Sequence, residues 1–245
     1  MKTKNFKTFS VVCAALAAMI SCKKENIVSR SSTGISNEVA KQTAIKVLDL
    51  RPGDQDGQDA LVVWREDNPD YANLNNGSFG ELPITAWTNG GNLVKQRVYI
   101  QFTGLSAIPR TANVSSAKLY LYGLDNSLNS PQGNSRYPGS PYDGSNKCVV
   151  AQVVDRWDES TITWNKQPGY STSDFAFFGP STSQWNWDTE IDVTKMVKRM
   201  VKYPRLNNGF AISLQNENIY RNMVFGASEA ANENDRPRLV VEYAE

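Results

Sequence analysis

The sequence predicts an all-β fold, specifically a jelly-roll-type antiparallel β-sandwich with one short helix. Two observations support this fold class. About ten short segments alternate polar and apolar residues or gather β-branched and aromatic residues, and both patterns are typical of strands. Clusters of Gly, Pro, Asn and Asp separate these segments, as turns and loops do. The 245-residue chain contains no internal repeat, and β-sandwiches reach this length as one domain.

We expect a strand wherever a run of β-branched or aromatic residues, or of alternating polar and apolar residues, lies between two turn signals. Loops rich in Asn, Asp and Gly over 53–59 and 67–79, and glycine-containing turns at 89–91 and 207–209, separate several of them. The run at 185–193 places tryptophans and aliphatic residues on one face and Asp188, Glu190 and Asp192 on the other. The predicted strands are 43–50, 60–64, 83–87, 94–102, 114–122, 147–154, 161–163, 185–193, 210–214, 223–225 and 239–243.

One segment, 194–202, has the period of a helix instead of that of a strand. Its apolar side consists of Met196, Val197, Met200 and Val201. Asp192 or Thr194 is expected to cap its first turn. A second non-strand segment, 125–146, contains three Gly and three Pro. We interpret it as a disordered or decorative loop, and the alternative is a functional loop whose Tyr137 and Tyr142 contact a ligand.

The first 21 residues have the pattern of a secretion signal. Three lysines within the first seven residues precede an apolar stretch over 9–20, which is too short to span a bilayer as a helix. The stretch ends in Ala-Met-Ile-Ser-Cys, which resembles a bacterial lipobox. We therefore expect an outer membrane lipoprotein, at the cell surface or the periplasmic face, attached to the membrane through a lipid on Cys22. The alternative is an ordinary secretory signal. We expect residues 22–42 to form a flexible tether and residues 43–245 to form the β-sandwich domain.

The composition excludes several kinds of active site. The chain contains no histidine, which rules out a Ser-His-Asp triad, a Cys-His pair and an imidazole zinc site. Cys148, with no histidine to activate it, is expected to be a small buried residue. Basic and acidic residues nearly balance, at 26 and 25, so no global charge favours nucleic acid as a partner. The sequence carries no signal of oligomeric state.

An acidic segment offers the one candidate for a metal. Asp54, Asp56 and Asp59 lie close together around glycines, and carboxylate oxygens are the ligands that Ca²⁺ prefers. Their spacing does not match an EF-hand loop, so a solvated acidic turn is the simpler interpretation. No other cofactor is predicted.

Two strands carry the candidate binding residues. In 94–102, Val98, Ile100 and Phe102 share the apolar face, and in 114–122 the apolar face consists of Ala117, Leu119 and Leu121. The opposite faces are basic and aromatic because side chains alternate along a strand. The candidate residues are Lys95, Arg97, Tyr99 and Gln101 on the first strand and Lys118, Tyr120 and Tyr122 on the second, with Trp64, Arg65 and Trp87 at the edge.

The segment 157–168 reads Trp-x-Glu-Ser-Thr-Ile-Thr-Trp-Asn-x-x-Pro, and we call it the signature loop. Together with 97–102 followed by 116–122, the Asp-Val-Thr at 192–194, and 228–229 with 236–243, this loop resembles the DNRLRE domain. That family consists of secreted β-sandwich modules, some of which bind alginate-like acidic polysaccharides. The resemblance implies that 97–102 and 116–122 pair, so that their polar faces merge into one patch. It also implies that Trp157 and Trp164 fill the core.

We therefore expect a surface-anchored, non-catalytic carbohydrate-binding protein for an acidic polysaccharide such as alginate. Aromatic rings would stack on sugars, and Lys95, Arg97 and Lys118 would pair with carboxylates. The alternative is a structural or adhesive module that docks another protein. A polysaccharide lyase, with Tyr99 as the base beside Arg97, is the third hypothesis.

Overall fold

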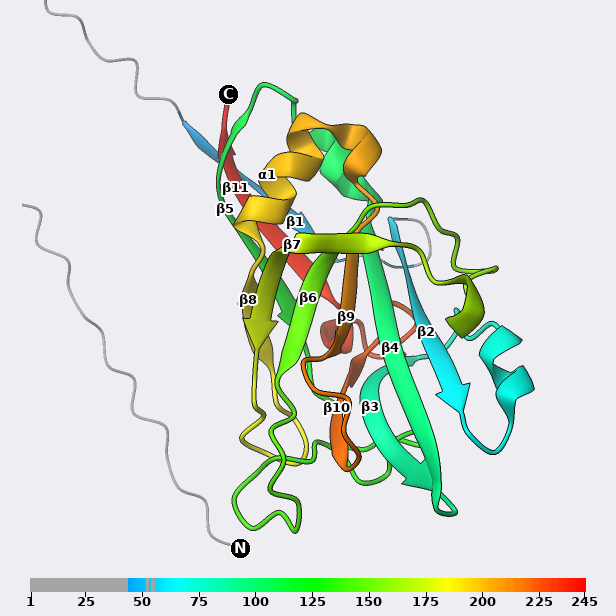
Figure 1. The fold of residues 1–245 in the computed structure, drawn as a ribbon. Coiled ribbons are helices and arrows are strands. Elements are labelled where there is room, and N and C mark those ends of the chain that lie inside the picture. The colour runs from blue at the N-terminus through cyan, green and yellow to red at the C-terminus, as the bar shows by residue number, and fades with distance from the viewer. Residues whose placement is uncertain (1–43, 52, 54–55) are drawn as a thin grey trace, which may run out of the picture. The chain divides into compact units, whose positions relative to one another are not determined.

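Two antiparallel sheets face each other in the computed structural model, which describes residues 44–51, 53 and 56–245 (Figure 1). The predictions for the signal, the tether, Cys22 and Asp54 lie outside the described residues. The smaller sheet has the order β1 (Ile45–Leu50), β11 (Arg238–Ala244), β5 (Asn113–Leu121) and β8 (Thr189–Asp192). The larger sheet has the order β10 (Arg221–Gly226), β3 (Glu81–Asn89), β4 (Asn92–Phe102), β9 (Phe210–Leu214), β6 (Cys148–Val153) and β7 (Tyr170–Phe178), and β2 (Gly57–Arg65) also pairs with β4. This architecture confirms the predicted all-β sandwich.

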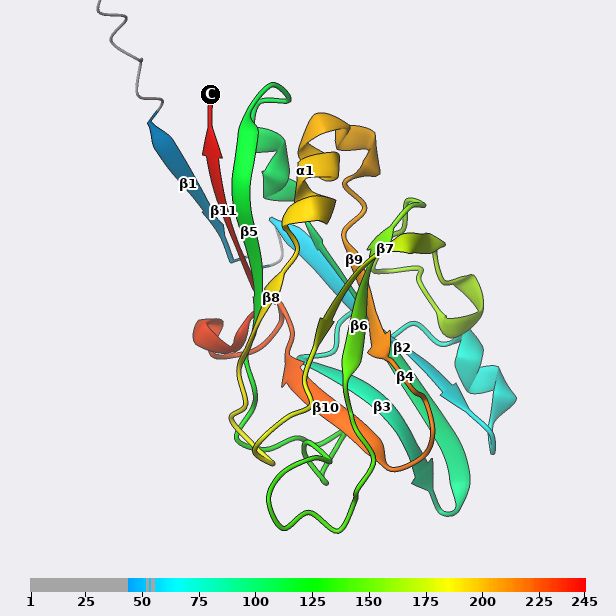
Figure 2. The same cartoon turned by 60° about the vertical axis from the view of Figure 1, so that its left-hand side comes forward.

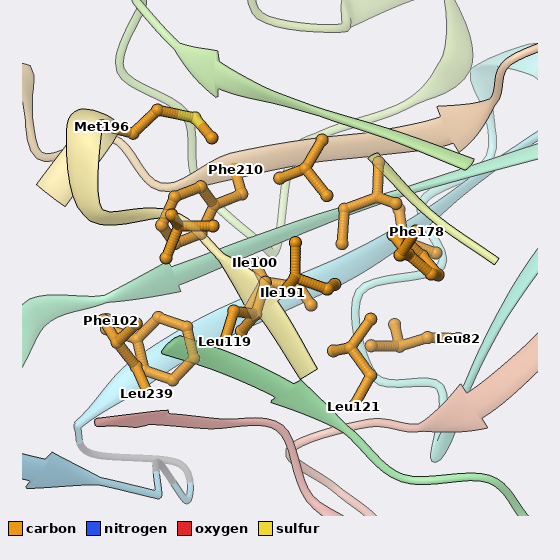
Figure 3. Close-up of a cluster of buried hydrophobic side chains, with 14 of the residues drawn as sticks. Leu82, Ile100, Phe102, Leu119, Leu121, Phe178, Ile191, Met196, Phe210 and Leu239 are labelled. Carbon is orange, nitrogen blue, oxygen red and sulfur yellow. The ribbon is translucent and has the colours of Figure 1, made fainter. Parts of the chain in front are cut away.

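The main core lies between the two sheets. Ile100 and Phe102 of β4 point inward from one sheet, and Leu119 and Leu121 of β5 point inward from the other, as their alternation predicts (Figure 3). The ring of Phe102 lies 6.5 Å from the ring of Phe210 on β9. Burial of each such side chain contributes about 1.5–3 kcal/mol of transfer free energy, so this layer supplies most of the force that holds the sheets together.

The expected pairing of β4 with β5 is wrong. Strand β4 pairs with β2, β3 and β9, whereas β5 pairs with β11 and β8 in the other sheet. Each strand has one apolar face, and the structure buries these two faces against each other instead of placing the strands side by side. Their polar faces therefore lie on opposite outer surfaces of the sandwich, and they do not merge into one patch.

The predicted helix is α1 (Thr194–Lys202), and its four apolar residues are all buried at one end of the sandwich (Figure 2). The Asp192 carboxylate accepts a hydrogen bond of 3.0 Å from the Thr194 amide, and the Thr194 hydroxyl accepts one of 2.9 Å from the Ala117 amide of β5. The Asp-Val-Thr corner thus joins β8, α1 and β5. None of the helices in the described part of the chain is long and apolar enough to cross a membrane.

Two strand predictions fail and one strand was missed. Residues 161–163 form a turn that leads into a 3₁₀ helix (Trp164–Lys166), because the Thr163 hydroxyl caps the Lys166 amide at 3.2 Å. Strand β8 is shorter than predicted, and Trp187 instead lies before it, with its ring 6.1 Å from that of Phe225. Strand β7 directly follows the signature loop, and the polar residues in its first half conceal its strand character.

The long segment over 125–146 is packed, not disordered. A buried polar network centred on Asn222 of β10 holds it against the sheet. The Asn222 side-chain amide donates to the Gly133 carbonyl at 2.8 Å, and the Asn146 side-chain amide donates to the Asn222 carbonyl at 2.8 Å. The Val224 amide donates to the Asn134 side chain at 3.1 Å. Buried polar groups must be paired, so these bonds select one conformation of the loop.

Candidate functional site

A groove of about 480 Å³ lies on the outer face of the larger sheet, and its lining residues come mainly from β4, β9, β6 and β7. Cross-strand register explains its shape. Tyr99, Ala211, Ala151 and Phe175 lie opposite one another on successive strands, so their side chains share this face. The two middle positions are alanines, and Tyr99 beside them is buried, so these three residues form the floor of the groove. Phe175 rises from one side of this floor.

One wall of the groove consists of exposed aromatic rings on β7, the terminal strand of the sheet. Tyr170, Phe175 and Phe177 are 44, 43 and 48 % exposed, respectively. The rings of Phe175 and Phe177 lie 6.4 Å apart and are tilted by 42°. An exposed cluster of large apolar side chains is a candidate binding surface.

The other wall is charged. The Arg97 guanidinium donates from Nε to Glu217 Oε1 at 2.7 Å and from Nη2 to Oε2 at 3.0 Å, and it stacks 4.7 Å from the centre of the Trp164 ring. Lys95 Nζ lies 3.6 Å from the same carboxylate. Burial acts to raise the pKa of Glu217, but the hydrogen bonds and charges of Arg97 and Lys95 outweigh it and hold that pKa below its ordinary value.

Charged side chains lie both in the groove and beside it. Arg97 and Glu217 are the charged residues that line the groove, and they pair with each other. Lys95 lies beside this pair, and Lys147 Nζ lies 5.1 Å above the Phe177 ring of the aromatic wall. The two lysines place positive charge at the margins of the groove although the whole chain is nearly neutral.

Tyr99 lies at the floor of the groove but is not an exposed stacking platform. Its side chain is 1 % exposed, and its ring lies 5.8 Å from that of Trp157. The Tyr99 hydroxyl donates to Gln167 Oε1 at 3.0 Å. Burial raises the pKa of this hydroxyl well above its ordinary value, which makes it a poor base.

The signature loop covers Tyr99 and forms a second small core on the outer face. Trp157 and Trp164 pack there against Tyr99 and Ile162, so the expectation that they fill the core between the sheets is wrong. The Trp157 indole donates to the Asn208 carbonyl at 2.9 Å. The loop therefore supports the charged wall of the groove from below, because Trp164 lies beneath Arg97.

Gln101 is bound within the protein and does not line the groove. Its side-chain amide donates to the Asn207 carbonyl, and its oxygen accepts from the Gln58 amide. Trp64 pairs in register with Lys95 and so shares the outer face at the neighbouring strand. Gln101 and Trp64 are both half-buried.

Arg65 and Trp87 line a different cavity of about 380 Å³, together with the segment 129–132. The Arg65 guanidinium donates two hydrogen bonds to the Asp67 carboxylate, from Nη2 at 2.7 Å and from Nε at 3.0 Å. Trp87 lies in an aromatic cluster, 4.7 Å from the ring of Tyr142 and 5.3 Å from that of Tyr220. These two predicted residues are therefore not part of the groove.

The candidates on β5 lie on the opposite outer surface. Lys118 is paired with Asp192 at 3.2 Å and with Glu190 at 3.4 Å. Arg238 lies 5.6 Å above the Tyr120 ring, and Arg51 lies 4.9 Å above the Tyr122 ring. The two sheets pack about 10 Å apart, so Lys118, Tyr120 and Tyr122 cannot act with Arg97 on one ligand.

The predicted acidic cluster does not form as expected. Asp54 lies outside the described residues, and Asp56 is exposed in a turn. Asp59 is 1 % exposed and instead lies beside Glu159 and Glu229. Cys148 is buried, as predicted, and burial raises the pKa of its thiol.

Sequence reasoning missed the aromatic wall and Glu217. The signal for the wall was present in Phe175-Ala176-Phe177, where two aromatic residues alternate with a small one. The signal for Glu217 was absent, because it lies in a loop and meets Arg97 only through the fold. Of the predicted residues, the structure thus places Arg97 and Tyr99 in the groove and Lys95 beside it, and the exposed aromatic residues there are Tyr170, Phe175 and Phe177.

Comparison with known proteins supplies the class of ligand. None of the curated proteins matches the chain. The family model of carbohydrate-binding module family 96 matches residues 59–243, a range that includes every residue lining the groove. Because the match extends over most of the chain and over both sheets, the protein is a carbohydrate-binding module that belongs to carbohydrate-binding module family 96.

Proposed function

We propose that the groove on the larger sheet binds an acidic polysaccharide such as alginate, and that the protein does so without catalysis while anchored at the cell surface. The observation that carries this proposal is the pairing of an exposed aromatic wall with a wall of basic side chains. This proposal keeps the predicted acidic ligand and places its site at β7 and β4, without β5.

The aromatic wall suits the flat, apolar faces of sugar rings. Tyr170, Phe175 and Phe177 present nearly half of their surface to solvent, and β7 holds them in one direction. Aromatic rings bury large areas at a low cost in conformational entropy, because each has two rotatable side-chain bonds. The wall therefore provides affinity for a glycan of any charge.

The basic wall favours uronate residues. Arg97 has five N–H donors; Glu217 accepts one hydrogen bond from Nε and one from Nη2, and Gln167 accepts one from Nη1 at 3.4 Å. Lys95 and Lys147 beside the groove add positive charge that attracts a polyanion. Charge-assisted hydrogen bonds between guanidinium and carboxylate groups then distinguish an acidic chain from a neutral one.

Two features argue against a lyase. A lyase needs a base whose pKa lies near the working pH, whereas burial raises that of Tyr99. The Tyr99 hydroxyl is also engaged by Gln167. Capture of the polysaccharide is the simpler role, and the lipid at Cys22 together with the tether would hold the module near the membrane that carries it.

Affinity electrophoresis tests the proposal. The mature chain with Cys22→Ser is run in gels containing alginate, xylan or no polysaccharide. We expect retardation by alginate that weakens as salt is added, because exposed charges are screened. The variant Lys118→Ala/Tyr120→Ala, altered on the opposite surface, is the matched control and should be retarded equally. If alginate retards the parent chain but not this control variant, the binding site lies at β5 instead of in the groove.

The alternative of a protein-docking or adhesive module rests on one observation. Strand β7 ends the larger sheet and exposes two phenylalanines, and terminal strands can pair with strands of other proteins. Migration unaffected by every polysaccharide would favour this alternative over glycan capture.

A further inference from the structure

Three carboxylates from distant parts of the chain converge at one point. Asp59 belongs to β2, Glu159 to the signature loop, and Glu229 to the segment after β10. One carboxylate oxygen from each lies within 4.8 Å of the others. Asp59 pairs in register with Ile100 and so faces the inside of the sandwich, whereas the groove lies on the outer face of the same sheet. This cluster is therefore separate from the proposed glycan site.

Two of these carboxylates have oxygens buried without a protein partner. Asp59 is 1 % exposed; its Oδ2 accepts from the Ser228 amide at 2.7 Å, and its Oδ1 has no hydrogen-bond partner. Glu229 Oε1 accepts from the Ser228 hydroxyl at 2.8 Å, and its Oε2 is likewise buried and unpaired. In the described part of the chain, no ion pair includes either residue. Buried charges require such partners, so these oxygens point to a missing one.

The backbone around the cluster is held in place. The Asn75 side chain donates to the Glu159 carbonyl at 2.6 Å, and the Glu159 amide donates to Gln58 at 3.2 Å. The Asp59 amide donates to the Glu159 carboxylate at 3.2 Å. A side chain at Gly77 would place its Cβ 2.3 Å from the Glu159 carbonyl, so only glycine permits this approach. The carboxylates are thus positioned by the fold, which is what a metal site requires.

We infer that Asp59, Glu159 and Glu229 bind one Ca²⁺ ion that joins β2, the signature loop and the segment after β10. An all-carboxylate set is typical of hard cations, and the chain has no histidine to favour a transition metal. Ca²⁺ binds oxygen at about 2.3–2.6 Å, so ligands on opposite sides of it lie about 4.6–5.2 Å apart. The three oxygens all lie within 4.8 Å of one another, so one Ca²⁺ ion can contact all of them, whereas Mg²⁺ is usually held by one or two carboxylates together with water.

The ion would also support the groove at a distance. Glu159 lies in the same loop as Trp164, which stacks on Arg97, and as Gln167, which engages Tyr99. Without the ion, repulsion among the three carboxylates opposes the packing of this loop against β2. Calcium would therefore stabilise the fold in the absence of any glycan.

Equilibrium dialysis and thermal unfolding test the inference on the mature chain with Cys22→Ser, after treatment with EDTA. We expect one Ca²⁺ bound per chain. At a calcium concentration one hundred times the Kd, the unfolding temperature should rise by about 5–10 °C. Glu229→Gln and Asp59→Asn should lose both effects, whereas Asp56→Asn, altered in the exposed turn nearby, should retain them. In EDTA, each site variant should unfold at or above the temperature of the parent, because a neutral amide removes the repulsion.

Three results would overturn the inference. The first is no calcium bound by the parent chain, in which case the buried carboxyls share protons instead. The second is calcium binding that survives in both Glu229→Gln and Asp59→Asn, or that is lost in Asp56→Asn. The third is an equal response to MgCl₂, which would refute the assignment of the metal. Glu229→Gln keeps the test decisive even if Asp59→Asn fails to fold.

Discussion

Replacing Phe175 and Phe177 by alanine should weaken alginate binding about 30-fold. These rings are 43 and 48 % exposed, and a phenylalanine side chain presents about 200 Å², so the pair exposes about 180 Å². A sugar ring that covers half of this surface removes about 90 Å² from water. At about 25 cal/mol per Å², the lost contact is worth about 2 kcal/mol, or about 30-fold in Kd.

Isothermal titration calorimetry with an alginate oligosaccharide measures this change. The double variant should unfold within a few degrees of the parent, because substitutions of half-exposed residues are usually mild. Tyr203→Ala is the matched control, since Tyr203 is 52 % exposed on the segment after α1 and lies outside the groove. A Kd for Phe175→Ala/Phe177→Ala equal to that of the parent would refute the placement of the glycan against β7.

Three further predictions concern charge, packing and reactivity. Glu217→Gln should tighten alginate binding several-fold at low salt and steepen its salt dependence, since the groove loses its acid but keeps its shape; titrations at 50 and 500 mM NaCl measure this, and an unchanged Kd would refute the role of charge. Asn222→Ala should lower the free energy of unfolding by about 1–3 kcal/mol and expose 125–146 to limited proteolysis, because partners such as the Gly133 carbonyl lose their bonds. Cys148 should resist a thiol reagent at pH 8 in the folded Cys22→Ser chain, because burial raises its pKa and keeps the thiol neutral below that value; rapid labelling before unfolding would contradict this.

Local pattern predicted which way most side chains point. The alternation in β4 placed Ile100 inward and Arg97 outward, and the period of 194–202 identified α1 and its buried face. These properties depend on residues a few positions apart, so they can be recognised without the tertiary structure. The fold class followed from the same signals, and the signature loop indicated a family with a sugar-binding role.

The pairing of strands was beyond the reach of local pattern. Two amphipathic strands can lie side by side in one sheet or face each other across a core, and β4 and β5 satisfy either arrangement equally well. The choice depends on which other strands occupy their edges, and those partners, such as β9 and β11, lie more than one hundred residues away. For this reason the prediction that Lys118 and Arg97 share one surface patch was wrong.

Sequence by itself determined the class of fold, the inward and outward faces of β4, β5 and α1, and the family to which the signature loop points. Only the tertiary structure decided that the signature loop covers Tyr99, that β7 supplies the aromatic wall, and that Glu217 meets Arg97. It alone brought Asp59 to Glu159 and Glu229. Periodicity records the environment of a residue along its own strand, whereas a binding site depends on contacts between strands, and those are set by how the sheets pair and stack.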